Sequence, residues 1–200
     1  MKKIIALLLI LATAFALAAC RGKDPDPVGT SDGSATVADY NEAISKTNPS
    51  VVTIRTTFEN TAPAATLEGE YVVTYNVDGT ATIVYEYDVL NSIGADEMVS
   101  KKQGTAQLLA DGKISGSIDK TVAAAAVGKI ALDEKKMDYD ISMGTLNAVI
   151  KAANTKAVLG IELGSDATLL MRITNDGYIG SYSISYSTSA GNADIVCIFS

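Results

Sequence analysis

The residues that most often perform chemistry in proteins are scarce in this 200-residue chain. It contains no histidine, so a Ser-His-Asp triad, a Cys-His pair and an imidazole metal site are all excluded. Ser117 and Lys120 have the Ser-x-x-Lys spacing of one class of serine nucleophile, but the partner motifs of that acyl-transfer chemistry do not follow. We therefore expect that the protein is not an enzyme.

Carboxylates are plentiful, but their spacing argues against a catalytic or metal site. Glu68 and Glu70, and likewise Glu86 and Asp88, stand two residues apart on expected strands, so each pair would lie on one solvent-facing side of a sheet. The aspartates within residues 21–35 lack the ligand spacing of an EF-hand loop. We expect no metal ion and no cofactor.

The nine tyrosines are the remaining candidates for contact with a ligand. Tyrosine is also common in strands, where its ring packs half-buried and its hydroxyl reaches a polar group. The tyrosines therefore have two interpretations, a structural one and a ligand-binding one.

The N-terminus has the three-part pattern of a secretory signal. Lys2 and Lys3 precede a predominantly apolar run over residues 4–17, and small residues follow. The run is shorter than the about 20 apolar residues of a comfortable membrane span. The segment Leu17-Ala18-Ala19-Cys20 resembles the lipobox of bacterial lipoproteins.

This resemblance implies cleavage of a signal peptide over residues 1–19 and acylation of Cys20, for example with palmitate. Each buried CH₂ of an acyl chain contributes about 0.8 kcal/mol, so two or three chains hold a soluble domain firmly at a bilayer. The protein would then be lipid-anchored in a bacterial cell envelope, on the outer face of the cell membrane or in the outer membrane. A plain secretory signal with an incidental cysteine is the alternative.

The rest of the chain is long enough for one domain. Residues 20–35 are rich in Pro, Gly, Asp and Ser and predict a flexible stalk, and residues 36–200 predict a single domain. The formal net charge is −7, and loss of Lys2 and Lys3 would make it −9, so we expect no nucleic-acid partner. Cys197 then lacks a partner cysteine; we expect a buried thiol and a monomer.

A helix is expected near the start of the domain. Val37, Tyr40 and Ile44 recur with helical spacing, Ser34 or Thr36 supplies the N-cap, and the helix ends before Asn48-Pro49.

From Ser50 the hydrophobic period changes to two, which indicates strands. Asp-Gly pairs at 78–79, 111–112 and 176–177 stand between such segments and predict hairpin turns. We expect about seven or eight strands in an antiparallel meander. On the strand after the third turn, Tyr178, Tyr182, Ile184 and Tyr186 would share an apolar face that opposes a serine face.

Residues 119–160 interrupt this pattern with an alanine-rich segment and a second expected helix. Leu146, Val149, Ile150 and Ala153 share one face of that helix over residues 143–159. A long insertion with helices is uncommon within a meander, so we expect it to cover the sheet.

The order of these elements resembles that of the outer-membrane lipoprotein-sorting carriers and the related LppX-like lipid-binding lipoproteins, over roughly residues 36–200. The resemblance implies an α+β fold, in which an open half-barrel of strongly curved antiparallel sheet carries two or three helices on its concave face. It also implies binding or carriage of a lipid or other hydrophobic small molecule in an apolar cavity. The candidate lining residues are Tyr85, Tyr87, Tyr182, Ile184 and Tyr186 on strands, with Leu146, Val149 and Ile150 as a lid.

A second hypothesis is a cell-surface interaction protein. In that case the helices fill the core completely, and the serine and threonine face or a sheet edge binds a protein or a glycan. An apolar void of about 300 Å³ or more would favour the first hypothesis, and a filled core the second.

Overall fold

The computed structural model describes residues 35–116, 118, 122, 125 and 130–200. Residues 34–200 form a compact unit separate from residues 1–33. The predicted signal peptide, Cys20, almost all of the stalk, Ser117 and Lys120 lie outside the described residues.

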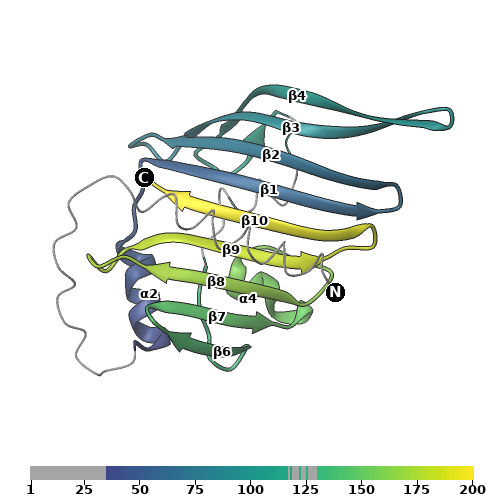
Figure 1. Cartoon of the computed structure of the whole chain (residues 1–200). Helices are drawn as coiled ribbons and strands as arrows, with labels where there is room; N and C mark the ends of the chain where they lie inside the picture. The colour runs from purple at the N-terminus through teal and green to yellow at the C-terminus, as the bar shows by residue number, and fades with distance from the viewer. Residues whose placement is uncertain (1–34, 117, 119–121, 123–124, 126–129) are drawn as a thin grey trace. The chain divides into compact units, whose positions relative to one another are not determined.

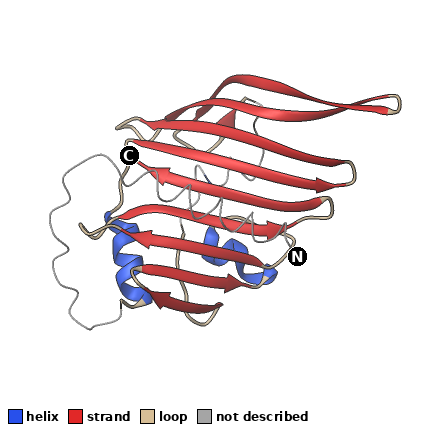
Figure 2. Ribbon diagram, in the orientation of Figure 1, coloured by secondary structure: helices blue, strands red, loops and turns tan. Residues whose placement is uncertain are grey.

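The described chain folds into one ten-stranded antiparallel sheet with the strand order β5-β4-β3-β2-β1-β10-β9-β8-β7-β6 (Figures 1 and 2). The strands are β1 (Val51–Thr61), β2 (Ala64–Tyr75), β3 (Ala81–Ile93), β4 (Asp96–Leu108), β5 (Ile114–Ser115), β6 (Met137–Ser142), β7 (Thr145–Ile150), β8 (Ala167–Ile173), β9 (Ile179–Ser187) and β10 (Gly191–Phe199). The antiparallel sheet is confirmed, and the expected number of strands is corrected from seven or eight to ten.

Two meanders, β1–β5 and β6–β10, meet at the centre of this sheet. The first strand pairs with the last one, with Ile54 opposite Cys197 and Phe58 opposite Ala193. The sheet is open, because its terminal strands β5 and β6 are not paired with each other in the described residues.

Helix α2 (Val37–Lys46) begins at a capping box. The Asp39 amide donates to the Thr36 hydroxyl at 3.3 Å, and the Thr36 amide donates to the Asp39 carboxylate at 2.7 Å. Val37, Tyr40 and Ala43 are buried, so the predicted helix and its Thr36 cap are confirmed.

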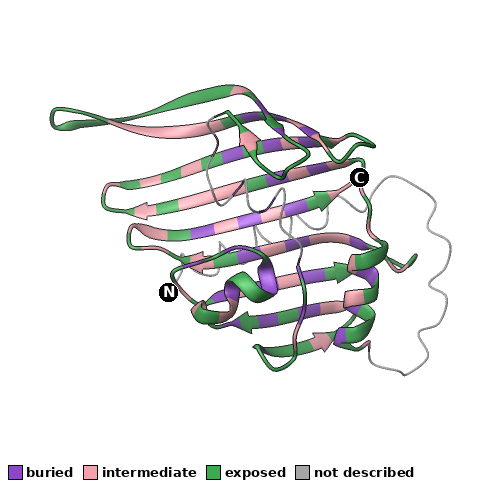
Figure 3. Ribbon diagram, turned by 180° about the vertical axis from the view of Figure 1, so that it is seen from behind, coloured by how far each residue is buried: buried purple, intermediate pink, exposed green. Residues whose placement is uncertain are grey.

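Helix α4 (Thr155–Leu159) follows a 3₁₀ turn, η1 (Ala152–Asn154), and ends at Gly160 in the left-handed conformation. The buried Thr155 hydroxyl donates to the Ala152 carbonyl at 2.9 Å and accepts the Leu163 amide at 3.0 Å. Both α2 and α4 lie on the same face of the β6–β9 half of the sheet (Figures 1 and 3).

The helix-bearing face of the sheet is apolar, because alternate residues of each strand point toward it. One cross-strand row runs through Tyr85, Tyr71, Ile54, Cys197, Tyr182, Met171 and Leu146, all buried. The opposite face carries the serines of β9 and ion pairs such as Arg55–Glu70, at 2.9 Å, and Lys101–Glu86, at 2.9 Å. The predicted division into an apolar and a polar face is confirmed.

The three predicted Asp-Gly hairpin turns are confirmed, since each glycine has a positive φ. The segment predicted as a second helix, residues 143–159, is wrong over its first part. Residues 145–150 form strand β7, which pairs with β6 and with β8. Leu146 and Ile150 stand four residues apart, and such a pair shares a face in a strand as well as in a helix. Val149 distinguishes the strand from the helix. A helix would place it on the same face as Leu146 and Ile150, but it is 40 % exposed on the opposite face of the sheet.

A second correction concerns the start of β9. Arg172 pairs with Ser181 but Ile173 pairs with Ile179, so the register shifts by one residue at Gly180. This bulge places Ile179 on the buried side and leaves Tyr178, which was predicted on the apolar face, 47 % exposed in the turn.

Candidate functional site

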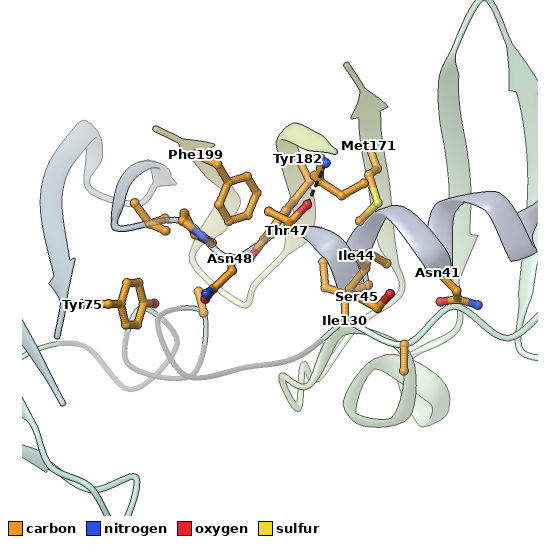
Figure 4. A pocket seen from close by; sticks show the side chains of 15 residues that line it. Asn41, Ile44, Ser45, Thr47, Asn48, Tyr75, Ile130, Met171, Tyr182 and Phe199 are labelled. Carbon is orange, nitrogen blue, oxygen red and sulfur yellow. Dashed lines mark hydrogen bonds between the residues drawn. The ribbon is translucent and has the colours of Figure 1, made fainter. Parts of the chain in front are cut away.

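A pocket of about 880 Å³ lies between α2 and the apolar face of the sheet, at the end where β1, β9 and β10 meet (Figure 4). Its described walls come from the last two turns of α2, the loop to β1, the ends of five strands, and Ala125, Ile130 and Ala131. The lining residues are Asn41, Ile44, Ser45, Thr47, Asn48, Pro49, Val52, Tyr75, Ala125, Ile130, Ala131, Met171, Ile179, Tyr182 and Phe199.

Aromatic rings form part of the pocket wall. The rings of Tyr182 and Phe199 lie 5.7 Å apart between centroids, tilted by 47°. Tyr75, at the end of β2, contributes a third ring that faces the same space (Figure 4). Aromatic and aliphatic groups together make most of the wall, which is the usual character of a small-molecule site.

Burial raises the pKa values of the ionisable groups in and beside this wall. Desolvation raises the pKa of Tyr75 to about 12 and that of Tyr182 well above its ordinary value. Cys197 lies directly across from Tyr182, and burial raises the pKa of its thiol to about 11. These phenols and this thiol therefore remain protonated at neutral pH.

Most polar side chains of the wall are used to hold the wall together. The Thr47 hydroxyl donates to the Ala43 carbonyl at 2.8 Å and accepts the Ile179 amide at 2.8 Å, which ties α2 to β9. Asn41 bonds both backbone groups of Leu132, at 2.9 and 3.0 Å. In contrast, the exposed Asn48 makes no side-chain hydrogen bond within the described residues. It is the polar group best placed to meet a ligand.

No charged side chain occurs among the described residues that line the pocket. Binding there would come mainly from removal of apolar surface from water, at about 25 cal/mol per Å². The described lining residues therefore provide no counter-ion for a charged ligand.

Of the lining residues predicted from the sequence, Tyr182 lines this pocket. Leu146, Ile150 and Ile184 are fully buried in the sheet face, and Val149 lies on the other face. Tyr186 is partly buried against the core on β9.

Tyr85 and Tyr87 lie elsewhere, in a cluster with Tyr71 on β2 and β3. The ring centroids lie 5.6 to 6.2 Å apart, and the Tyr71 and Tyr87 rings are stacked. Tyr85 lies over Gly104 so closely that a Cβ at that glycine would stand 2.6 Å from the Tyr85 hydroxyl. This packing of a ring on a strand glycine gives these tyrosines a structural role.

Most of the pocket was not predicted from the sequence. Asn48 and Pro49 were predicted only as the end of the helix, and Thr47 was given no role. The available signal was that this helix end lies directly before the first strand in the chain. Tyr75 and Phe199 stand at strand ends, and the meander alone did not bring those ends together. The β1–β10 pairing does so.

No group of three or more potential ligands that could hold a metal ion occurs in the described residues. No helix within that same part of the chain is long and apolar enough to cross a membrane. No protein-family model matches this chain, and no curated protein matches it.

Proposed function

We propose that this protein is an extracytoplasmic lipoprotein, anchored through Cys20, that binds or carries a lipid or another hydrophobic small molecule. The observation that carries the proposal is the pocket beside α2, whose volume of about 880 Å³ falls within the range of small-molecule sites. The function requires no chemistry at the site, which agrees with a chain that lacks histidine.

The wall suits an apolar ligand with at most a small uncharged polar group. The aliphatic side chains Ile44, Val52 and Met171 line the pocket together with three aromatic rings. Asn48 offers an amide from the loop between α2 and β1. A carboxylate or phosphate ligand would lose water there without gaining a cation from the described lining residues, and that loss is costly.

The proposal includes the finer part of the expected fold. We propose a strongly curved sheet that acts as an open half-barrel, with the helices on its concave side. The position of α2 and α4 on one face of the sheet supports this arrangement (Figure 3). The competing hypothesis of a cell-surface interaction protein needs a filled core, and the pocket weighs against it.

The proposal is tested by a charge placed in the pocket wall. Ile44 is partly buried in α2, and Glu retains good helix propensity, so Ile44→Glu adds a carboxylate to the site with little change to the helix. We expect binding of an apolar fluorescent dye to weaken at least about tenfold, since an unpaired charge in an apolar site is unfavourable.

Ile198→Glu is the matched control, because Ile198 is exposed on β10 at a position that does not line the pocket. That variant should bind the dye as the wild type does. Equal dye affinity in the wild type and both variants would refute the assignment of this pocket as the binding site.

A further inference from the structure

Four hairpin turns lie at the end of the sheet that carries the pocket, and each holds one large exposed apolar side chain. The turns join β4 to β5, β2 to β3, β8 to β9 and β6 to β7, in that spatial order along the sheet. The side chains are Leu109 (43 % exposed), Val77 and Met143 (both fully exposed) and Tyr178 (47 % exposed).

The first three of these turns share one hydrogen-bond pattern. In each, the amide of the first residue bonds the carbonyl of the fifth, and the Asp-Gly glycine amide bonds the carbonyl of the first, as in Thr174 to Tyr178 at 2.7 Å and Gly177 to Thr174 at 2.9 Å. The turns are therefore well fixed, and they present their apolar side chains from rigid supports.

Met143 is the least expected of the four. It has φ of +49°, a conformation that a non-glycine residue rarely adopts, and its side chain is fully exposed. A two-residue turn with positive φ at both positions favours Asn-Gly, whereas this one is Met143-Gly144. Met143 is therefore an unfavourable residue for this turn, and its side chain packs against nothing in the described domain that would offset the cost.

The opposite end of the sheet differs. Its β1–β2 turn holds Ala62 and Pro63, and its β9–β10 turn holds Ser189 and Ala190. The β3–β4 hairpin there carries Ile93 beside its turn, and Met98 and Val99 are exposed farther along its strand β4. The apolar turns thus gather at the pocket end, which lies at the left of Figure 1.

The arrangement of the four side chains suits a flat surface better than a protein partner. They lie in a row that spans about eight strand spacings, roughly 40 Å at about 4.8 Å per spacing. A protein interface concentrates its binding energy in a compact central cluster of side chains, and these residues do not form one. A bilayer accepts separate apolar side chains at any spacing, and tyrosine is favoured at its interface.

The charges at this end argue for a neutral lipid surface. Asp78 and Asp111 accept hydrogen bonds from Thr80 and Lys113, which lower the pKa of both carboxyls, so they remain ionised. Among the described cations at this end, Lys113 pairs with Asp111 at 2.6 Å and Lys46 pairs with Glu42, while Arg172 near the end of β8 is exposed. Within the described residues the acidic groups at this end, Asp176 included, outnumber the cations, so they do not attract an anionic headgroup strongly.

We propose that this end of the sheet docks on the surface of a zwitterionic lipid bilayer, with the four apolar turns inserted at the interface. This inference rests on the proposed function, because a lipid-anchored protein that binds lipid would meet a bilayer surface. Tyr75 ends β2 two residues before Val77, and Ile179 directly follows Tyr178. Both residues line the pocket, so the docked turns would hold the pocket beside the bilayer from which its ligand comes.

The absence of tryptophan from the chain allows a local test. Full-length Val77→Trp and Met143→Trp proteins each carry a single tryptophan in a turn of the pocket end. Ser189→Trp carries it in an exposed turn of the opposite end and has the same lipid tether. Each is mixed with phosphatidylcholine vesicles, with and without bromine on the acyl chains.

We expect tryptophan emission at shorter wavelength and at least about twofold quenching by brominated lipid for Val77→Trp and Met143→Trp, with little change for Ser189→Trp. Quenching equal to that of Ser189→Trp in both variants would overturn the docking inference. So would quenching that requires phosphatidylglycerol. If the dye still binds the pocket in that case, the docking inference alone fails; if dye binding is also absent, the proposed function fails with it.

Discussion

At the scale of single residues, the pocket wall depends on groups that stay uncharged. Cys197 is fully buried, and Tyr182 stands beside it in the next strand. Because the pKa of the thiol rises from 9.0 to about 11, the folded protein holds almost no thiolate at pH 8. The thiol behaves as a small apolar core group.

This predicts slow reaction of Cys197 with a thiol reagent at pH 8. The raised pKa alone lowers the thiolate fraction roughly 100-fold, and burial lowers the rate further. The measurement is the rate of labelling of a Cys20→Ser chain, with and without denaturant. Fast labelling of the folded chain would contradict a buried Cys197.

The same raised pKa values give a pH dependence of stability. The contribution of each group to the free energy of unfolding is fully present below its ordinary pKa, which is 9.0 for Cys197 and 10.0 for Tyr75. It is lost as the pH rises toward the pKa in the folded protein, about 11 for Cys197 and about 12 for Tyr75. We therefore expect the free energy of unfolding to fall above about pH 9. Denaturant titrations between pH 8 and pH 11 measure it, and a free energy that rises across this interval would contradict this burial.

At the scale of elements, the β1–β10 pair joins the two meanders. Gly191 begins β10 opposite Asn60, and a Cβ there would overlap the carbonyl of Glu59. The contact is with backbone, so it cannot be relieved by a side-chain rotation.

We expect Gly191→Ala to destabilise the domain by about 3 kcal/mol, because β1 and β10 must separate locally to admit the methyl group. Gly164→Ala is the matched control, since a Cβ at Gly164 meets nothing within 4 Å. Thermal unfolding of both variants measures the difference. Equal melting temperatures would show that the close approach at Gly191 is not as described.

The elements also show where sequence patterns are sufficient and where they are not. Thr36 and the Asp-Gly pairs determine their structures locally, through a cap and through positive φ, and these predictions are confirmed. The β6–β7 hairpin was missed because Met143-Gly144 is an unusual turn and because Leu146 and Ile150 fit both periods. The β1–β10 pairing joins residues more than 130 positions apart, and no local pattern specifies it. Most of the pocket depends on that pairing.

At the scale of the whole molecule, the location of the protein and its ligand depend on different parts of the chain. The lipobox-like Leu17-Ala18-Ala19-Cys20 predicts the anchor independently of the pocket. In a bacterial host fed a labelled palmitate analogue, the wild-type chain should incorporate label and Cys20→Ser should not. Equal labelling of the two would contradict acylation at Cys20.

We propose that the pocket beside α2 holds a hydrophobic molecule. Native mass spectrometry of the wild-type protein, purified from a bacterial envelope without added lipid, tests it most directly. We predict an added mass from an uncharged or weakly polar lipid in the wild type and in Ile198→Glu, and its loss in Ile44→Glu. Wild-type protein that carries no added mass, and that also fails to bind an apolar dye, would contradict the account.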